Sequence, residues 1–66
     1  MFFYNENVIQ VGNFDTINYM DDNKIVIKFT SFLLIINGTN LSISGLNERE
    51  IYIVGKIIRI DFNYVK

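Results

Sequence analysis

The fold of this chain is decided by the stretch KIVIKFTSFLLIINGTNLSISG, which occupies residues 24–45. Apolar side chains recur there at every second position, beginning with Ile25, Ile27 and Phe29. The same alternation returns in residues 57–64. A period of two is typical of β-strands that turn one face toward a core. The sequence therefore predicts an all-β protein.

Turn-forming residues divide the chain into short strands. We expect a single small domain over residues 1–66, in which residues 1–7 are a short N-terminal extension. It should hold six or seven mostly antiparallel strands closed as a sandwich or barrel, with a stacked β-roll as the alternative. The predicted strands are Val8–Val11, Asp15–Tyr19, Lys24–Thr30, Phe32–Asn37, Asn40–Ser44, Glu50–Val54 and Ile57–Tyr64. The last two are also compatible with one strand bent at Gly55.

Glycines mark the expected turns and bulges. Asn37-Gly38 is a strong hairpin dipeptide, because both residues tolerate the positive φ of a type I′ turn. Gly45 begins the next expected break, and Gly12 and Gly55 each follow a valine within a β-prone run, where glycine permits a bulge or bend.

A weak internal repeat accompanies these glycines. Residues 11–19 and 54–62 share a Val-Gly start, an apolar residue two positions on, and an Ile-x-aromatic end. Either both are strand–bend–strand units that need glycine for the same reason, or they are two copies of a duplicated half-unit.

Composition restricts the chemistry that the chain can perform. It has 66 residues, no Cys, no His and a net charge of −1. Disulfides and thiolate or imidazole metal sites are therefore excluded, and no basic patch favours nucleic acid. A chain of this size buries only roughly 60% of its unfolded surface. Self-association is the remaining source of additional burial, so we expect a homo-oligomer.

No group of residues has the pattern of a catalytic or binding site. Asp21-Asp22 is best explained as a solvated turn, and Glu48-Arg49-Glu50 as a charged loop tip. The glycines do not form a phosphate-binding loop, because no glycine-rich run precedes a helix. We therefore expect a protein that is not an enzyme, with no catalytic residue, cofactor, metal or small-molecule substrate.

One strand carries apolar residues on both faces. Leu34 and Ile36 alternate with Leu33 and Ile35, so either the strand is covered twice or its second face is a contact surface. In the first case the segment at residues 2–4 covers Leu33 and Ile35. In the second case they form an interface that Tyr52 and Val54 could extend. The candidate interface residues are Phe32, Leu33, Ile35, Tyr52 and Val54.

The termini and apolar runs indicate a cytoplasmic protein. The longest apolar run, residues 32–36, is far shorter than the roughly 20 residues that cross a bilayer. Residues 1–6 lack the basic and apolar regions of a signal peptide.

The spacing of apolar residues and glycines resembles that of the YabP/YqfC family of small sporulation proteins. The matching pattern covers about residues 8–63. It runs Leu34-x-Ile36-x-Gly38-x-x-Leu41-x-Ile43-x-x-Leu46, then Glu50-Ile51-x-Ile53-x-Gly55-x-Ile57-x-x-Ile60-x-Phe62. Phe32 departs from the family, which commonly has glycine at that position.

The resemblance implies a non-enzymatic protein of low-GC, endospore-forming bacteria. Members act in the mother cell in coat or cortex morphogenesis, and membrane proteins encoded beside them are thought to be their partners. The implied location is the mother-cell cytoplasm, at the membrane through such a partner. No functional residue is transferred. Two alternatives remain open: a small barrel that binds single-stranded nucleic acid, and a structural protein of a phage or mobile element.

Overall fold

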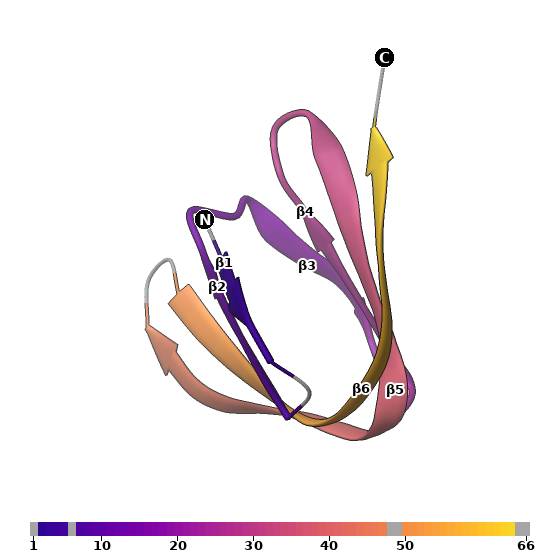
Figure 1. Ribbon diagram of the computed structural model, residues 1–66. Coiled ribbons are helices and arrows are strands. Elements are labelled where there is room, and N and C mark those ends of the chain that lie inside the picture. The colour runs from indigo at the N-terminus through magenta and orange to yellow at the C-terminus, as the bar shows by residue number, and fades with distance from the viewer. Residues whose placement is uncertain (1, 6, 48–49, 65–66) are drawn as a thin grey trace.

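Six strands form one antiparallel sheet in the part of the chain that the structure describes. The computed structural model describes residues 2–5, 7–47 and 50–64 (Figure 1). The strands are β1 (Phe2–Tyr4), β2 (Val8–Gly12), β3 (Thr16–Met20), β4 (Lys24–Lys28), β5 (Phe32–Asn47) and β6 (Glu50–Tyr64). Their order in the sheet is β1-β2-β6-β5-β4-β3, and every neighbouring pair is antiparallel. The all-β prediction and the antiparallel pairing are confirmed, but the strands form one open sheet rather than the closed sandwich or barrel that was expected. A roll of stacked rungs does not match this pairing either.

The sheet is open and folds over on itself, because β5 and β6 are long and bent. Residues 50–54 of β6 pair with β2, and residues 32–37 of β5 pair with β4. We call β1, β2 and the parts of β5 and β6 beside them the β2 half. The β4 half comprises β3, β4, residues 32–37 of β5 and residues 57–64 of β6. Figure 1 shows the two halves facing each other, with the bends of β5 and β6 at the fold.

The core lies between the two halves. Most of its side chains come from alternate positions of β2, β4, β5 and β6, as the period of two predicts, and Phe14 and Phe29 add to it from the connections between strands. No polar side chain is buried among the described residues. Full burial of a side chain of this size contributes about 1.5–3 kcal/mol. The buried residues are Ile9, Val11, Phe14, Ile25, Ile27, Phe29, Leu34, Ile36, Leu41, Ile51, Ile53 and Ile57.

Gly38 and Gly55 lie at the bends of the two long strands. A Cβ on Gly38 would overlap the carbonyl oxygen of Lys56. Gly55 has a φ of 138°, and its Cβ would lie 2.7 Å from the carbonyl oxygen of Asn40. Only glycine permits both this conformation and so close an approach of two backbones.

The hairpin predicted at Asn37-Gly38 is wrong. Asn37 pairs with Arg59 and Gly38 with Ile57, so β5 continues past the dipeptide alongside β6. Long-range pairing with β6 therefore overrides the local preference for a turn, and Gly38 serves close packing instead. β5 and β6 each join two predicted strands. The turn at residues 21–23 lies where a turn was predicted, whereas β4 ends at Lys28, two residues before the end of the predicted strand Lys24–Thr30.

The other two glycines lie in strands. Gly45 has a φ of 81° where the register of β5 against β6 shifts between Ile43 and Leu46, as in a β-bulge. The break expected over residues 45–48 therefore begins only after Asn47, and Glu48 lies outside the described residues. Gly12 ends β2 opposite Glu50.

The segment predicted to be an extension forms β1. It pairs with β2, at the opposite side of the sheet from β4. Its backbone therefore does not lie over Leu33 and Ile35, and the interpretation in which it covers them is wrong. Its side chains lie outside the described residues.

The two halves are related by an internal pseudo-two-fold. Ile9 of β2 pairs with Ile53 of β6, as Ile25 of β4 pairs with Ile36 of β5. The hairpin β1–β2 with the first part of β6 thus corresponds to the hairpin β3–β4 with the first part of β5. This correspondence is not the repeat noted at residues 11–19 and 54–62. Val11 and Val54, which begin the two copies of that repeat, do not occupy equivalent positions in the two halves.

Equivalent hydrogen bonds hold the two bends. The N–H of Gly55 donates to the carbonyl of Asn7, 3.2 Å away, and the N–H of Gly38 donates to the carbonyl of Asn23, 3.0 Å away. Each hairpin turn therefore braces the bend of the long strand beside it. At the second bend, the Asn23 amide also donates to the carbonyl of Gly38, and the N–H of Leu41 donates to the carbonyl of Asp22.

The turns themselves are also equivalent. The Oδ1 of Asn5 accepts from the backbone N–H groups two and three residues on, at 2.9 and 3.1 Å. The Oδ1 of Asp21 accepts from the same two positions of its own turn, both at 2.8 Å. These Asx turns fix each hairpin locally.

Candidate functional site

The described residues offer no cluster of side chains suited to holding a metal ion. In this part of the chain no three His, Cys, Asp or Glu side chains lie together as ligands would. No helix capable of spanning a membrane is found among the described residues either. The features that remain are the outer faces of the two halves.

An apolar row crosses the outer face of the β4 half. Val26 of β4 pairs with Ile35 of β5 on one side and with Tyr19 of β3 on the other. Cross-strand partners point to the same face, so the three side chains are neighbours. Leu33 lies two positions from Ile35 on the same face. Val26, Leu33 and Ile35 are only half-buried and Tyr19 is 51% exposed. We call these four residues the outer patch.

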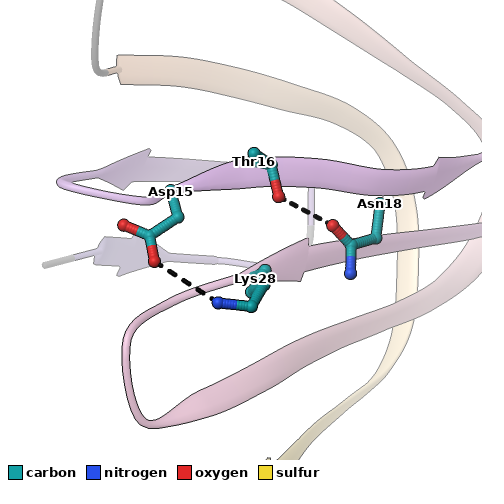
Figure 2. Close-up of polar contacts among 4 residues, drawn as sticks. All are labelled: Asp15, Thr16, Asn18 and Lys28. Carbon is teal, nitrogen blue, oxygen red and sulfur yellow. Dashed lines mark hydrogen bonds and ion pairs between the residues drawn. The ribbon is translucent and has the colours of Figure 1, made fainter.

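Charged and polar residues border the outer patch. Lys28 pairs with Leu33, and its Nζ lies 3.6 Å from Oδ2 of Asp15 (Figure 2). Figure 2 also shows the Thr16 hydroxyl, which donates to Oδ1 of Asn18 at 2.7 Å. An ion pair this exposed contributes roughly 0–1 kcal/mol. These groups therefore form a solvated rim rather than a structural anchor.

The Tyr19 side chain is fixed by a hydrogen bond at the end of the row. Its hydroxyl donates to Oδ2 of Asp21 at 2.6 Å. The hydrogen bond to this carboxylate, and then its charge, raise the pKa of Tyr19. The same bond, followed by the N–H of Asn23, lowers the pKa of Asp21. Both shifts favour the neutral phenol and the ionised carboxylate, which holds the ring beside Val26.

The outer face of the β2 half is polar at its centre. Gln10 and Tyr52 are cross-strand partners, and the Gln10 amide donates to the Glu50 carboxylate. Val54 pairs with Val8 nearer the bend. The pseudo-two-fold places Val26, Leu33 and Ile35 at positions equivalent to Gln10, Glu50 and Tyr52. The two equivalent faces thus differ at two of these three positions, where Gln10 and Glu50 replace apolar residues, whereas Tyr52 is apolar like Ile35.

The structure separates the candidate interface residues into three places. Leu33 and Ile35 lie together in the outer patch. Tyr52 and Val54 lie on the outer face of the other half, which points the opposite way, so they do not extend it. Phe32 lies on the inner face, stacked on Phe29 with ring centroids 4.6 Å apart. Its other ring neighbours are Phe62 and Tyr64, at 5.5 and 5.4 Å.

Sequence reasoning missed two members of the outer patch. Val26 lies between Lys24 and Lys28 in the sequence, a pattern that is typical of a solvated face. The pairing of β4 with β5 brings it beside Ile35, and the pairing with β3 adds Tyr19. The outward apolar position among lysines was the available signal, and it needed the strand order to be interpreted.

Comparison with known proteins gives one match. The model of the YabP family matches residues 1–66, the full length of the sequence. No curated protein and no solved structure matches the chain. The match agrees with the resemblance carried by the glycine and apolar spacing, and family membership is consistent with a sporulation-related role. The chain belongs to the YabP family.

Proposed function

We propose that this protein is a non-enzymatic structural or assembly protein of endospore coat or cortex morphogenesis. It acts by self-association and by docking to an integral membrane protein. The outer patch is the observation that carries the proposal, and the family assignment supports the setting.

The outer patch supports a role in protein contact because the equivalent surface of the same fold has polar residues at the positions of Val26 and Leu33. Where Glu50 and Gln10 bond to each other on the β2 half, the β4 half presents Leu33 and Val26. The sheet does not need apolar residues at these positions, since the β2 half folds without them. Apolar side chains that the fold does not require favour a partner.

We assign the outer patch to contact between copies of the chain. A domain of 66 residues has little core of its own. Packing two outer patches together would bury Val26, Leu33 and Ile35, with Lys28 and Asp61 at the border. The membrane partner rests on the family assignment, and no surface is assigned to it.

The experiment is a measurement of mass in solution by light scattering across a range of concentrations. Leu33→Glu gives the β4 half the residue found at the equivalent position of the β2 half, and it should lower the mass at equal concentration. Tyr52→Glu, the matched variant on the opposite face, should leave the mass unchanged. A mass that falls with Tyr52→Glu and not with Leu33→Glu would contradict the assignment.

The cellular role is tested separately in an endospore-forming host. Loss of the gene should block coat or cortex formation, and Leu33→Glu should reproduce that block at normal protein levels. Normal spores from the deletion strain would contradict the sporulation role. Vesicles that carry the membrane protein encoded beside this chain should bring the chain down with them on sedimentation, whereas vesicles without that protein should not.

A further inference from the structure

The residues around the outer patch lie in rows across the β4 half. In the middle row Val26 pairs with Ile35, and Ile35 also pairs with Asp61 of β6. Tyr19 continues this row on β3. The middle row therefore runs from an aromatic ring at the β3 side of the half to a carboxylate at the β6 side.

The row nearer the bend carries opposite charges at its two ends. Lys24 pairs with Asn37, and Asn37 pairs with Arg59 at the β6 side. At the β3 side, the N–H of Asp21 donates to the carbonyl of Lys24, 2.8 Å away. Because Oδ2 of Asp21 accepts from the Tyr19 hydroxyl, these two side chains lie on the same, outer face. An acidic residue thus ends this row beside β3, and a basic residue ends it on β6.

Arg59 is placed to bind a second carboxylate. Its Nε lies 2.8 Å from Oδ2 of Asp61, and its side chain is 71% exposed. A guanidinium has five N–H donors, so one that contacts a carboxylate through Nε can bind another through its two outer nitrogens. Asp21 is also exposed, but it lies about three strand spacings away, roughly 14 Å. The two groups therefore complement each other without meeting in one chain.

Two outer patches can pack face to face about two kinds of two-fold axis. Packed sheets keep their strands roughly aligned, so the axis runs either across the strands or along them. An axis across the strands, along the middle row, places each Asp61 opposite the other copy's Asp61. It also places each Lys24 opposite the other copy's Lys28. Like charges then face each other in both places, which disfavours this arrangement.

An axis along the strands, between β4 and β5, brings opposite charges together. β4 then lies over the other copy's β5, so Val26 packs on Ile35. β3 lies over the other copy's β6, so Asp21 faces Arg59 and Tyr19 faces Asp61. Each of these contacts occurs twice, and no like charges face each other in the two rows.

We propose that two copies of this chain join face to face through their outer patches about a two-fold axis along the strands, with each Arg59 between Asp61 of its own chain and Asp21 of the other. The patch supplies the apolar centre, and the two Asp21–Arg59 pairs fix the register. This inference rests on the proposed function for self-association and adds the orientation of the copies. Because both copies use the same face, the contact closes at two chains.

Charge exchange tests the orientation. Arg59→Glu places two acidic groups opposite each other twice, and Asp21→Arg does the same with two basic groups. Each variant alone should raise the dissociation constant of the two-chain species roughly tenfold or more. Lys56→Glu makes the same change in net charge as Arg59→Glu at an exposed position outside these rows, and it should leave the dissociation constant unchanged.

Mixing Arg59→Glu with Asp21→Arg gives the sharper result. One chain then carries two acidic groups and the other two basic groups, so both facing pairs are attractive. Native mass spectrometry of the mixture should show two-chain species of mixed mass that form as readily as those of the unmodified chain. Circular dichroism of each variant checks that it is folded.

Cross-linking tests the same orientation without changing Asp21. The sequence has no cysteine, so single substitutions report single contacts. A mixture of Tyr19→Cys and Asp61→Cys chains should be joined by a short bifunctional maleimide, because these positions face each other. Asp61→Cys alone should stay unjoined, since its two copies lie about three strand spacings, roughly 14 Å, apart to the side.

Three results would overturn the inference: charge variants that associate as tightly as the unmodified chain, a folded mixture that associates no better than its components, or Asp61→Cys chains that are joined to each other. If Asp21→Arg does not fold, the cross-linking result decides. In all three cases an unmodified chain that associates, with a mass lowered by Leu33→Glu, leaves the proposed function standing. An unmodified chain that is single at every concentration would overturn both.

Discussion

The β2 half and the β4 half have similar side chains on their inner faces and different side chains on their outer faces. On the inner faces, Ile9 and Ile53 of one half correspond to Ile25 and Ile36 of the other, and all four are fully buried. On the outer faces, a glutamine–glutamate hydrogen bond corresponds to an apolar pair. Burial in a shared core constrains the inner positions equally. The outer positions are free of that constraint, and they differ between the two halves.

The largest expected effect tests whether the insides are equivalent. Ile36→Ala and Ile53→Ala each remove a fully buried side chain at corresponding positions. Each should lower the free energy of unfolding by about 2–5 kcal/mol. Urea denaturation of both variants should give similar losses. A large loss at one position and almost none at the other would show that the halves do not share one core.

The next effect tests the two bends. Gly38→Ala places a Cβ against the Lys56 carbonyl, and Gly55→Ala also strains a φ of 138°. Each should cost about 2–3 kcal/mol. Gly45→Ala is the matched control, because it has the strained φ of 81° but its nearest neighbour is the Tyr52 side chain at 3.4 Å. The control should lower the free energy of unfolding by only about 1 kcal/mol. An equal loss in all three variants would show that the close approach of the two backbones does not matter at Gly38 and Gly55.

A smaller effect on folding accompanies Leu33→Glu. Leu33 is half-buried on the outer face, away from the core. Measured at a concentration where the chain is single, its unfolding free energy should change by less than about 1 kcal/mol. A loss as large as that of Ile36→Ala would mean that Leu33 belongs to the core, and the change in mass would then report unfolding.

The smallest expected effect is that the two Asx turns, at Asn5 and at Asp21, differ in how their contribution to the stability of the fold depends on pH. The hydrogen bond from Tyr19 lowers the pKa of Asp21, whereas Asn5 at the equivalent turn position does not titrate. A carboxyl with a lowered pKa in the folded state stabilises the fold above its unfolded pKa. That contribution is lost as pH falls through the folded value.

The other member of this pair, Tyr19, makes a contribution to stability that is lost at high pH. The raised pKa of Tyr19 means that the folded state retains the proton longer, so its contribution is present below the unfolded pKa and is lost as pH rises through the folded one. Asp21→Asn should therefore flatten the stability profile below about pH 4 and above about pH 10. Urea midpoints across that range check it, and an unchanged profile would contradict the Tyr19–Asp21 hydrogen bond.

The sequence predicted which residues face the core better than it predicted where the strands begin and end. Alternating apolar residues such as Ile25 and Ile27 identified core positions, because burial acts on each strand regardless of its neighbours. The Asn37-Gly38 hairpin was wrong because a dipeptide preference is local, whereas β6 pairs along both sides of it. The strand β1 was missed because three residues show no period.

The candidate site could be predicted only in part. Leu33 and Ile35 were visible because they alternate with buried residues on one strand. Tyr19 and Val26 join them only through the strand order β3-β4-β5, which single-strand patterns do not contain. The same limit explains why Tyr52 and Val54 were grouped with them: the bend at Gly55, which turns their face the opposite way, depends on contacts between strands.

The central claim is that this chain works by presenting β-sheet surface to other protein chains. Its most direct test is the mass of the unmodified protein measured by light scattering over increasing concentration. We predict a mass that rises above that of one chain and that falls back in the Leu33→Glu variant. A mass equal to one chain at every concentration would contradict the claim.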